Sequence, residues 1–349
     1  MAVTRVLTQK CIARIVDQVG LDALLDELIE RLRTAFVRYD PACVQVVVRS
    51  GFRYDTPDLG LIEWMPAMES GRRVSIKTVG YHPSNPVERG SPSVLGTTSL
   101  HDTADGRLLA LCEATFLTAL RTGAASAVVT DALAIPGAST LGMIGCGAQA
   151  VTQIHAIARV RPLERIKAFD IDPKIAGTLG LRLRKAGIMA TVEVVAAPDD
   201  AIAEVDILCT ATSVSPGALP VVPDVPHRPW LHINAVGADH PGKRELAPGL
   251  VARAVVIPDT REQCATEGES QHIDPDRLGP EMADLIRHQG RYEYLRSQLT
   301  VFDSTGWALE DLVAAELVLD HAERLDEGFA LDLQPSPGDP YDPYEFLFS

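Results

Sequence analysis

The chain has 349 residues, 46% of them hydrophobic and 23% charged, and a formal net charge of −15. This length predicts two domains, and the acidic excess argues against nucleic acid or an anionic membrane surface as a partner. Six scattered cysteines, no signal-peptide core and no apolar run of spanning length predict a cytoplasmic protein.

The first part of the chain predicts a sheet-rich α+β region. Residues 21–37 are predicted to form an amphipathic helix, because leucines recur there at helical spacing. Short strands separated by loops rich in Pro, Gly and Asn are predicted at residues 43–48, 63–66, 74–79, 93–100 and 108–112. The last two strands would pair as a hairpin, and a long helix over 113–133 would follow.

Residues 140–172 carry the order strand, glycine-rich turn, helix, strand. Gly145 allows a tight turn, and Gly147 lets the backbone approach a pyrophosphate bound on the N–H groups of the new helix. Asp170 ends the second strand about twenty residues later, where an acid binds the ribose hydroxyls and repels a 2′-phosphate. The pattern therefore predicts a dinucleotide site that favours NAD over NADP. The alternative is a chance glycine turn between two strands.

After Asp170, strands and helices continue to alternate, which predicts a parallel sheet. Strands are expected at 190–195, 206–210, 230–236 and 254–257, and helices at 175–186, from about 199, and at 309–325. The last of these helices could return to the first domain. The Pro- and Asp-rich tail, residues 335–349, is expected to be irregular.

Several patches make the chain resemble the ornithine cyclodeaminase/mu-crystallin family, and within it the pipecolate-forming lysine cyclodeaminases. The patches are residues 49–52, 63–66, 77–79, 120–124, 145–150, 234–243, 267–269 and 302–306. The resemblance implies an α/β protein with a Rossmann NAD-binding domain at 125–318. A discontinuous α+β domain for substrate binding and dimerisation would cover 1–124 and be completed by 319–349. It also implies a homodimer, built through the sheet of that domain.

The implied activity is a redox-neutral cyclodeamination of a small diamino acid with NAD as a recycled cofactor. Hydride leaves Cα, the side-chain amine attacks the resulting imine, ammonia departs, and hydride returns to the cyclic imine. Conversion of L-lysine to L-pipecolate is favoured over conversion of L-ornithine to L-proline, because the patches resemble those of the pipecolate-forming branch. The two substrates differ by one methylene, which changes the binding free energy in an apolar pocket by only about 1–3 kcal/mol. No physical argument from sequence therefore separates them.

The resemblance assigns the substrate carboxylate to Arg49, Lys77 and Arg121, with Met65 as a pocket wall and Lys77 also able to move a proton. Arg121 stands among apolar residues, an awkward place for an unpaired charge, although a packing arginine is the alternative. Because insertions make the alignment with the family uncertain at this place, Arg53 is an alternative to Arg49 as the carboxylate ligand. Lys77 lies in an apolar strand, where a lysine more often points to solvent.

The resemblance makes Asp239 the catalytic base, which binds the distal amine and removes its proton; an ammonium is not a nucleophile until a proton is removed. It follows the strand at 230–236, at the strand's carboxyl end, where open α/β sheets bind ligands. A turn or N-cap aspartate is the alternative. Arg121 and Asp239 are also among the cofactor contacts that the resemblance implies; the others are Ser93, Gly145, Gly147, Ala148, Gln149, Asp170, Ala238, His240, Lys243 and Ser304.

Two other functions are compatible with this scaffold. An NAD(P)H-dependent ketimine reductase or amino-acid dehydrogenase would not need a base for a distal amine, so Asp239 argues against it. A non-enzymatic dinucleotide-binding protein would not need the set Arg49, Lys77, Arg121 and Asp239. No second ligand stands at metal-binding spacing from His240, so no metal is predicted.

Overall fold

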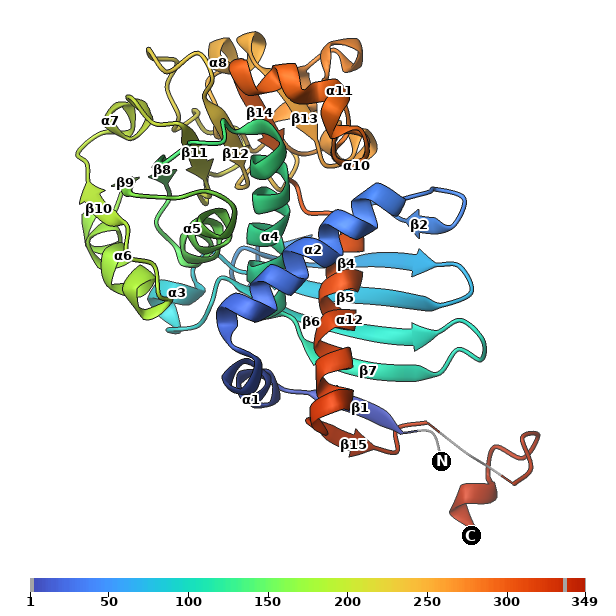
Figure 1. Cartoon of the computed structure of the whole chain (residues 1–349). Coiled ribbons are helices and arrows are strands. Elements are labelled where there is room, and N and C mark those ends of the chain that lie inside the picture. Colours follow the sequence, from blue (N-terminus) through green and yellow to red (C-terminus); the bar gives the residue numbers. More distant parts are fainter. Residues whose placement is uncertain (1–2, 335–337, 349) are drawn as a thin grey trace. The chain divides into compact units, whose positions relative to one another are not determined.

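The computed structural model describes residues 3–334 and 338–348, so residues 335–337 and 349 of the predicted tail lie outside the described residues. The chain divides into two compact units. The first comprises Met1–Val19, Ala42–Phe116 and Ala314–Ser349, and the second Gly20–Pro41 and Leu117–Val313. One unit holds a mixed sheet and the other a parallel sheet (Figure 1). The predicted fold class, a Rossmann domain with a discontinuous α+β domain, is confirmed.

The sheet of the first unit has the strand order β15-β1-β7-β6-β5-β4-β2, and β3 pairs with β4. Its strands are β1 (Thr4–Leu7), β2 (Val44–Val46), β3 (Ser50–Tyr54), β4 (Gly60–Glu69), β5 (Arg73–Tyr81), β6 (Val94–Asp102), β7 (Leu108–Glu113) and β15 (Phe329–Leu331). The helices α1 (Gln9–Val19) and α3 (Asn85–Glu88) belong to this unit. The predicted hairpin is the antiparallel pair β6 and β7.

One face of this sheet is covered and the other is open. Along β5, Ser75, Lys77 and Val79 are buried while Ile76 and Thr78 between them are exposed, as strand alternation requires. Helix α12 (Ala308–Leu325) runs along the covered side in this unit, and its Glu316 pairs with Arg72 and Arg73. The sequence left α1, β1, β3 and β15 unpredicted, because most of these elements are too short to show a period.

The second unit is built on a parallel sheet of order β10-β9-β8-β11-β12-β14-β13. Its strands are β8 (Thr140–Ile144), β9 (Arg165–Phe169), β10 (Thr191–Val194), β11 (Ile207–Thr210), β12 (His232–Ala235), β13 (Val255–Pro258) and β14 (Thr300–Asp303). Its helices include α2 (Leu21–Arg38), α4 (Thr115–Leu133), α5 (Ala148–Val160), α6 (Pro173–Lys185), α7 (Pro198–Ile202), α8 (Pro248–Arg253), α9 (Arg261–Cys264), α10 (Met282–Arg287) and α11 (Gln289–Tyr292).

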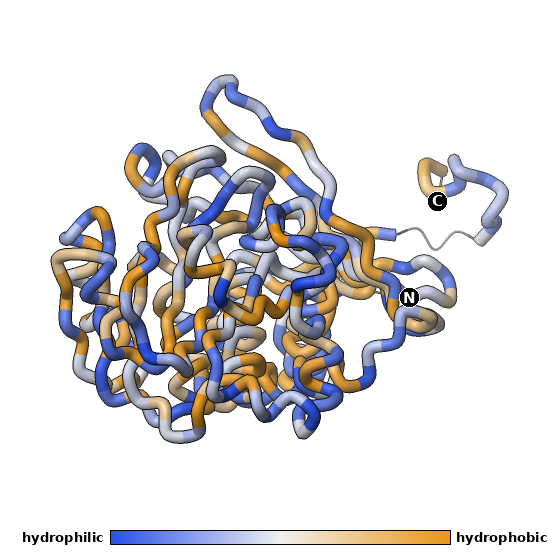
Figure 2. The backbone as a smooth tube through the Cα atoms, turned by 90° about the horizontal axis from the view of Figure 1, so that it is seen from above, coloured by the Kyte–Doolittle hydropathy of each residue, from blue (hydrophilic) through white to orange (hydrophobic). Residues whose placement is uncertain are grey.

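Strands β8, β11, β12 and β14 are buried along their whole length. Burial on both faces explains why β8 and β11 are short apolar runs in the sequence. Strand β14, which includes Thr300 and Asp303, was not predicted. Hydrophobic clusters fill the unit's core, one around Met143 and Ile154 and another around Ile233 and Val301. Along the chain, short hydrophobic stretches alternate with hydrophilic ones, the pattern expected of buried strands joined by exposed turns (Figure 2). Among the described residues, no helix is long and apolar enough to span a bilayer.

The units divide the chain differently from the predicted domains at 1–124, 125–318 and 319–349. Residues 20–41 cluster with the Rossmann unit, because α2 packs on α10 and α5. Ion pairs reinforce this packing, since Arg159 of α5 binds both Asp22 and Asp26 of α2. Nearly all of α4 also belongs to the Rossmann unit, so the division falls at the start of that helix rather than within it.

All of the cysteines lie within the described residues, and no disulfide joins any of them there. Cys43 is exposed, and the remaining thiols, at Cys11, Cys112, Cys146, Cys209 and Cys264, are buried. Burial raises the pKa of Cys112, Cys146 and Cys209 to about 12. These thiols therefore pack as small apolar groups.

Candidate active site

The glycine turn after β8 has the geometry that a dinucleotide requires. Gly145 has φ 89°, and a Cβ there would lie 2.6 Å from the carbonyl oxygen of Ala211, so only glycine fits. At Gly147 a Cβ would meet no atom within 4 Å, so the N-terminus of α5 faces open space. Unpaired N–H groups and the positive end of the helix dipole are suited to a pyrophosphate at this place.

Asp170 ends the next strand and is tied to this turn. Its carboxylate accepts hydrogen bonds from the backbone N–H of Cys146 (2.7 Å) and of Asp172 (2.9 Å). From α6, Arg182 donates to the carbonyl oxygens of Cys146 (2.6 Å) and Gly147 (3.0 Å). The turn is thus held from both sides, and Asp170 retains lone pairs for ribose hydroxyls.

Replacing Asp170 with Ala should weaken NAD binding about 10- to 100-fold, because charge-assisted hydrogen bonds are worth about 1.5–3 kcal/mol each. A fluorescence titration with NADH measures this affinity. Asp172→Ala is the matched control, because Asp172 caps α6 by accepting from the N–H of Lys174 (2.9 Å). The control should cost about 1 kcal/mol of stability and leave NADH affinity unchanged. Equal affinities of wild type and Asp170→Ala would remove the ribose role.

Asp239 follows β12 at the carboxyl edge of the parallel sheet. Its side chain is 44% exposed and pairs with the buried Nζ of Lys243 at 2.7 Å. Ala238 beside it is buried. The sequence assigned Lys243 to the cofactor, whereas here its ammonium orients the carboxylate of Asp239. The roles of both residues remain predictions.

Arg121 is buried on α4 with carboxylate partners in its own unit. Its Nε lies 3.0 Å from Oδ1 of Asp311, and its Nη1 lies 2.8 Å from Oε2 of Glu310. Burial alone would lower the pKa of Arg121, but the two carboxylates outweigh it and raise that pKa. The sequence indicated that the charge of Arg121 needs a partner, and the carboxyl groups of Glu310 and Asp311 supply two. A role of Arg121 in binding substrate stays a prediction.

The neighbouring Glu310 should give stability a marked pH dependence. Burial raises its pKa to about 8 from an ordinary 4.5, against the opposing charge of Arg121. A raised folded-state pKa contributes stability below pH 4.5 that is lost as the pH rises to 8, by up to about 1.4 kcal/mol per pH unit. Chemical unfolding of wild type and Glu310→Gln across this window should give free energies that are similar at low pH, where Glu310 is protonated, and that diverge as the pH rises, with the wild type becoming the less stable protein. Parallel curves would contradict this assignment.

The substrate residues predicted for the first unit lie on or beside β4, β5 and β6. Lys77 is 1% exposed and stands opposite the buried Met65 in the register of β5 and β4. Arg49 is largely buried, with its Nη1 3.8 Å from Oε2 of Glu63. The rival Arg53 is exposed on β3, which favours Arg49. Ser93 immediately precedes β6, and its carbonyl oxygen accepts from the N–H of His82.

Several buried or partly buried acids were not assigned any role from the sequence. Glu63 next to Arg49 is one, and Glu310 and Asp311 next to Arg121 are two more. Glu310 and Asp311 stand between the apolar residues Leu309, Leu312 and Val313, and that conflict is the signal that could have revealed them. Further buried carboxylates lie at or beyond the carboxyl edge of the sheet: Glu245 after β12, Glu269 after β13, and Asp303 at the end of β14.

Besides the glycine motif, a buried hydroxyl group in the Rossmann unit fits a bound dinucleotide. Ser304, directly after β14, has a buried Oγ without a hydrogen-bond partner among the described residues. Such an atom is suited to a ligand group, since a buried hydroxyl otherwise goes unsatisfied. The remaining predicted contacts lie close to the same edge: Ala148 and Gln149 in the first turn of α5, and His240 next to Asp239.

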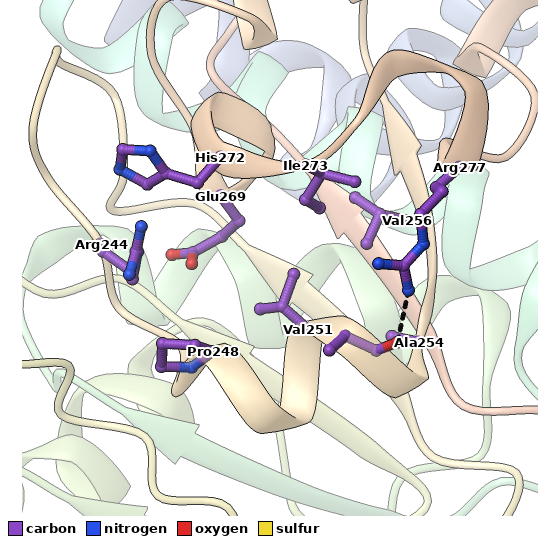
Figure 3. A pocket seen from close by; sticks show the side chains of 10 residues that line it. Arg244, Pro248, Val251, Ala254, Val256, Glu269, His272, Ile273 and Arg277 are labelled. Carbon is purple, nitrogen blue, oxygen red and sulfur yellow. Dashed lines mark hydrogen bonds between the residues drawn. The ribbon is translucent and has the colours of Figure 1, made fainter.

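A separate pocket of about 130 Å³ lies beside α8 and the 3₁₀ turn η1 (Glu269–His272) (Figure 3). Arg244, Glu269, His272 and Arg277 contribute its polar side chains. No predicted site residue lines it, so the candidate site remains the carboxyl edge of the parallel sheet. Across residues 3–334 and 338–348, no group of His, Cys, Asp or Glu side chains is arranged to hold a metal ion.

Comparison with known proteins gives the same family that the sequence patches predict. The model of the ornithine cyclodeaminase/mu-crystallin family matches residues 9–326. An L-lysine cyclodeaminase from Streptomyces rapamycinicus is 41% identical over 342 residues, 98% of this chain and 99% of the relative.

Two solved structures are similar to this chain over nearly its whole length. One described as the basis for recognition of L-lysine, L-ornithine and L-2,4-diamino butyric acid by lysine cyclodeaminase superposes with a TM-score of 0.94 at 43% identity, covering 98% of this chain and 99% of that chain. An archaeal alanine dehydrogenase dimer with bound NAD has a TM-score of 0.82 at 30% identity, covering 95% of this chain and 100% of that chain.

Proposed function

This chain belongs to the ornithine cyclodeaminase/mu-crystallin family, and on that basis we propose that it is an NAD-dependent cyclodeaminase that converts L-lysine to L-pipecolate and releases ammonia. One observation carries the proposal. Asp239, a partly exposed carboxylate, stands at the ligand-binding edge of the Rossmann sheet in a chain that matches an L-lysine cyclodeaminase over 98% of its length. L-Ornithine, giving L-proline, is the second substrate to test.

When bound, NAD supplies the redox chemistry, taking a hydride from Cα of the amino acid and returning it to the cyclic imine. Asp239 removes a proton from the distal ammonium, and the free amine then attacks the oxidised Cα. The Cα–N bond to the original α-amino group breaks, and ammonia leaves. Lys243 holds the carboxylate of Asp239 in one orientation through its ion pair.

The substrate carboxylate needs a cationic clamp, and the proposal gives that role to Arg49, Lys77 and Arg121. Guanidinium groups bind carboxylates through parallel hydrogen bonds, whereas an ammonium adds a point charge. Burial of Arg49 and Lys77 supports the proposal, because a charge removed from water interacts more strongly with a ligand. Met65 is the apolar wall beside Lys77.

The alternative is an amino-acid dehydrogenase or NAD(P)H-dependent ketimine reductase, favoured by the likeness to an archaeal alanine dehydrogenase. A mass-spectrometric assay with L-lysine or L-ornithine plus NAD⁺, read together with NADH absorbance, separates the two. A product lighter by one ammonia with no NADH accumulating supports the cyclodeaminase. Steady accumulation of NADH supports the dehydrogenase.

We also propose a homodimer formed through the open face of the first unit's sheet, which would make that unit the dimerisation and substrate-binding domain. Phe52, Ile62 and Leu95 are exposed in one row that crosses β5 at Gly80, and the exposed Ile76 lies on the same face of β5, four residues before Gly80. Phe52 packs edge-on against Trp64, 5.6 Å between ring centroids. A contiguous apolar face of this kind marks a protein contact. Light scattering should give twice the 37.6 kDa chain mass.

A further inference from the structure

Glu245 is a buried carboxylate whose hydrogen bonds come from the end of β11 and from the loops that follow β11 and β12. It is 0% exposed, and each of its oxygens accepts from one backbone N–H and one threonine hydroxyl. Oε1 accepts from the N–H and the hydroxyl of Thr212, both at 2.7 Å. Oε2 accepts from the N–H of Gly237 at 2.7 Å and from the hydroxyl of Thr210 at 2.6 Å.

These two loops leave the sheet at the edge where the candidate site lies. Thr212 follows β11, and Gly237 follows β12 two residues before Asp239. The approach is so close that a Cβ at Gly237 would lie 2.4 Å from Oε1 of Glu245, which excludes any other residue there. The backbone that leads into Asp239 is therefore fixed on the carboxylate of Glu245.

Glu245 is itself held by further carboxylates. Oε1 of Glu269 accepts from the N–H of Glu245 (2.6 Å) and of Leu246 (3.3 Å). Asp303, which ends β14, accepts from the N–H groups of Glu269 (2.9 Å) and Ser270 (2.8 Å). The Glu269 side chain lies among those lining the pocket of Figure 3. Hydrogen bonds from backbone N–H groups to the carboxyl groups of Asp303, Glu269 and Glu245 thus connect the end of β14 to the loop after β12.

We propose that Glu245 is a positioning residue for catalysis, which sets the segment 236–239 and with it the carboxylate of Asp239. The proposal rests on the proposed function, because it assigns Asp239 as the base. No neutral side chain of the same size can replace Glu245. Each oxygen faces a backbone N–H that can only donate, so an amide NH₂ group would meet a donor at either end.

The test compares Glu245→Gln with a matched control, Asp206→Asn. Asp206 is also buried and accepts from backbone N–H groups, those of Ser139 and Thr140, but it precedes β11 at the opposite edge of the sheet. Both changes turn a buried carboxylate that accepts from backbone N–H groups into an amide, and Asp206 in addition pairs with Arg228. Hydrogen exchange of peptides covering 211–213 and 236–240 should become faster in Glu245→Gln and stay as in wild type in Asp206→Asn.

Kinetics of lysine conversion supply the second readout. A base displaced by about 1 Å costs on the order of 100-fold, so kcat of Glu245→Gln should fall about 10- to 100-fold with a much smaller change in KM. Combining Glu245→Gln with Asp239→Asn should lower kcat no further than Asp239→Asn alone, because the residue acts through Asp239. Asp206→Asn should keep wild-type kcat.

Wild-type exchange at 236–240 in Glu245→Gln, or an equal loss of kcat in Asp206→Asn, would overturn the proposal. If Glu245→Gln does not fold, Thr212→Val removes one donor to Oε1 and should give the same changes on a smaller scale, or the proposal fails. A wild-type protein that releases no ammonia from either diamino acid would refute the proposed function, and the exchange experiment would still test the anchoring by Glu245.

Discussion

Replacing Asp239 with Asn should lower the rate of cyclisation by about 10²- to 10⁴-fold, the usual contribution of a positioned general base. Asn has nearly the shape of Asp and can still accept from Lys243, but it cannot take a proton from the distal ammonium. NAD binding should persist, because the glycine turn and Asp170 are untouched. Mass spectrometry of the lysine reaction measures the rate, and titration with NADH measures binding.

Asp224→Asn is the matched control for this change. Asp224 is a partly exposed carboxylate of the same unit and pairs with Arg253 at 2.6 Å, much as Asp239 pairs with Lys243. It should retain wild-type kinetics. Turnover of Asp239→Asn within a few-fold of wild type would end the assignment of Asp239 as the base.

The second large effect is expected from Arg121→Met, this time on stability. The guanidinium is 5% exposed, forms an ion pair with Asp311, which is 3% exposed, and donates a hydrogen bond to Glu310, which is 0% exposed. Removing one partner of a buried ion pair costs about 3–5 kcal/mol, because a charge remains in the interior without compensation. Urea unfolding of the purified protein should show this loss, and lysine turnover should fall with it if Arg121 also binds the substrate.

A triple variant separates the charge effect from the packing effect. Arg121→Met combined with Glu310→Gln and Asp311→Asn leaves no buried ion, so much of the lost stability should return. Turnover should not return, since the cationic group is still missing. A triple variant as unstable as the single variant would show that packing around Arg121 matters more than charge.

The alternating strands and helices of the Rossmann unit were predictable because their signals are local. The strands β8, β9 and β11 are short apolar runs between turns, and α5 shows its helical period in residues 148–160. The placement of α2 was not predictable. Its apolar face indicates burial, yet nothing in that face says whether it packs on the nearby strands or on α10 and α5.

The candidate site was predictable where a backbone motif defines it and less so where side chains pair over long distances. The turn at Gly145 and Gly147 has a spacing that only a few structures use. The partners of Arg121 lie about 190 residues away in sequence, and the hydrogen bonds of Glu245 join segments that no short pattern connects. Such contacts depend on the finished fold, so sequence indicated a need for partners without naming them.

The distribution of thiols makes the native protein selectively reactive towards alkylating reagents. Only a thiolate reacts quickly, and the buried thiols such as Cys146 are protonated and screened from solvent, whereas Cys43 is exposed. A maleimide dye should therefore attach at Cys43 alone, just before β2, without any engineered substitution. Unfolding would release the other cysteines, so the number of labelled positions rises from one to all six and reports the loss of structure directly.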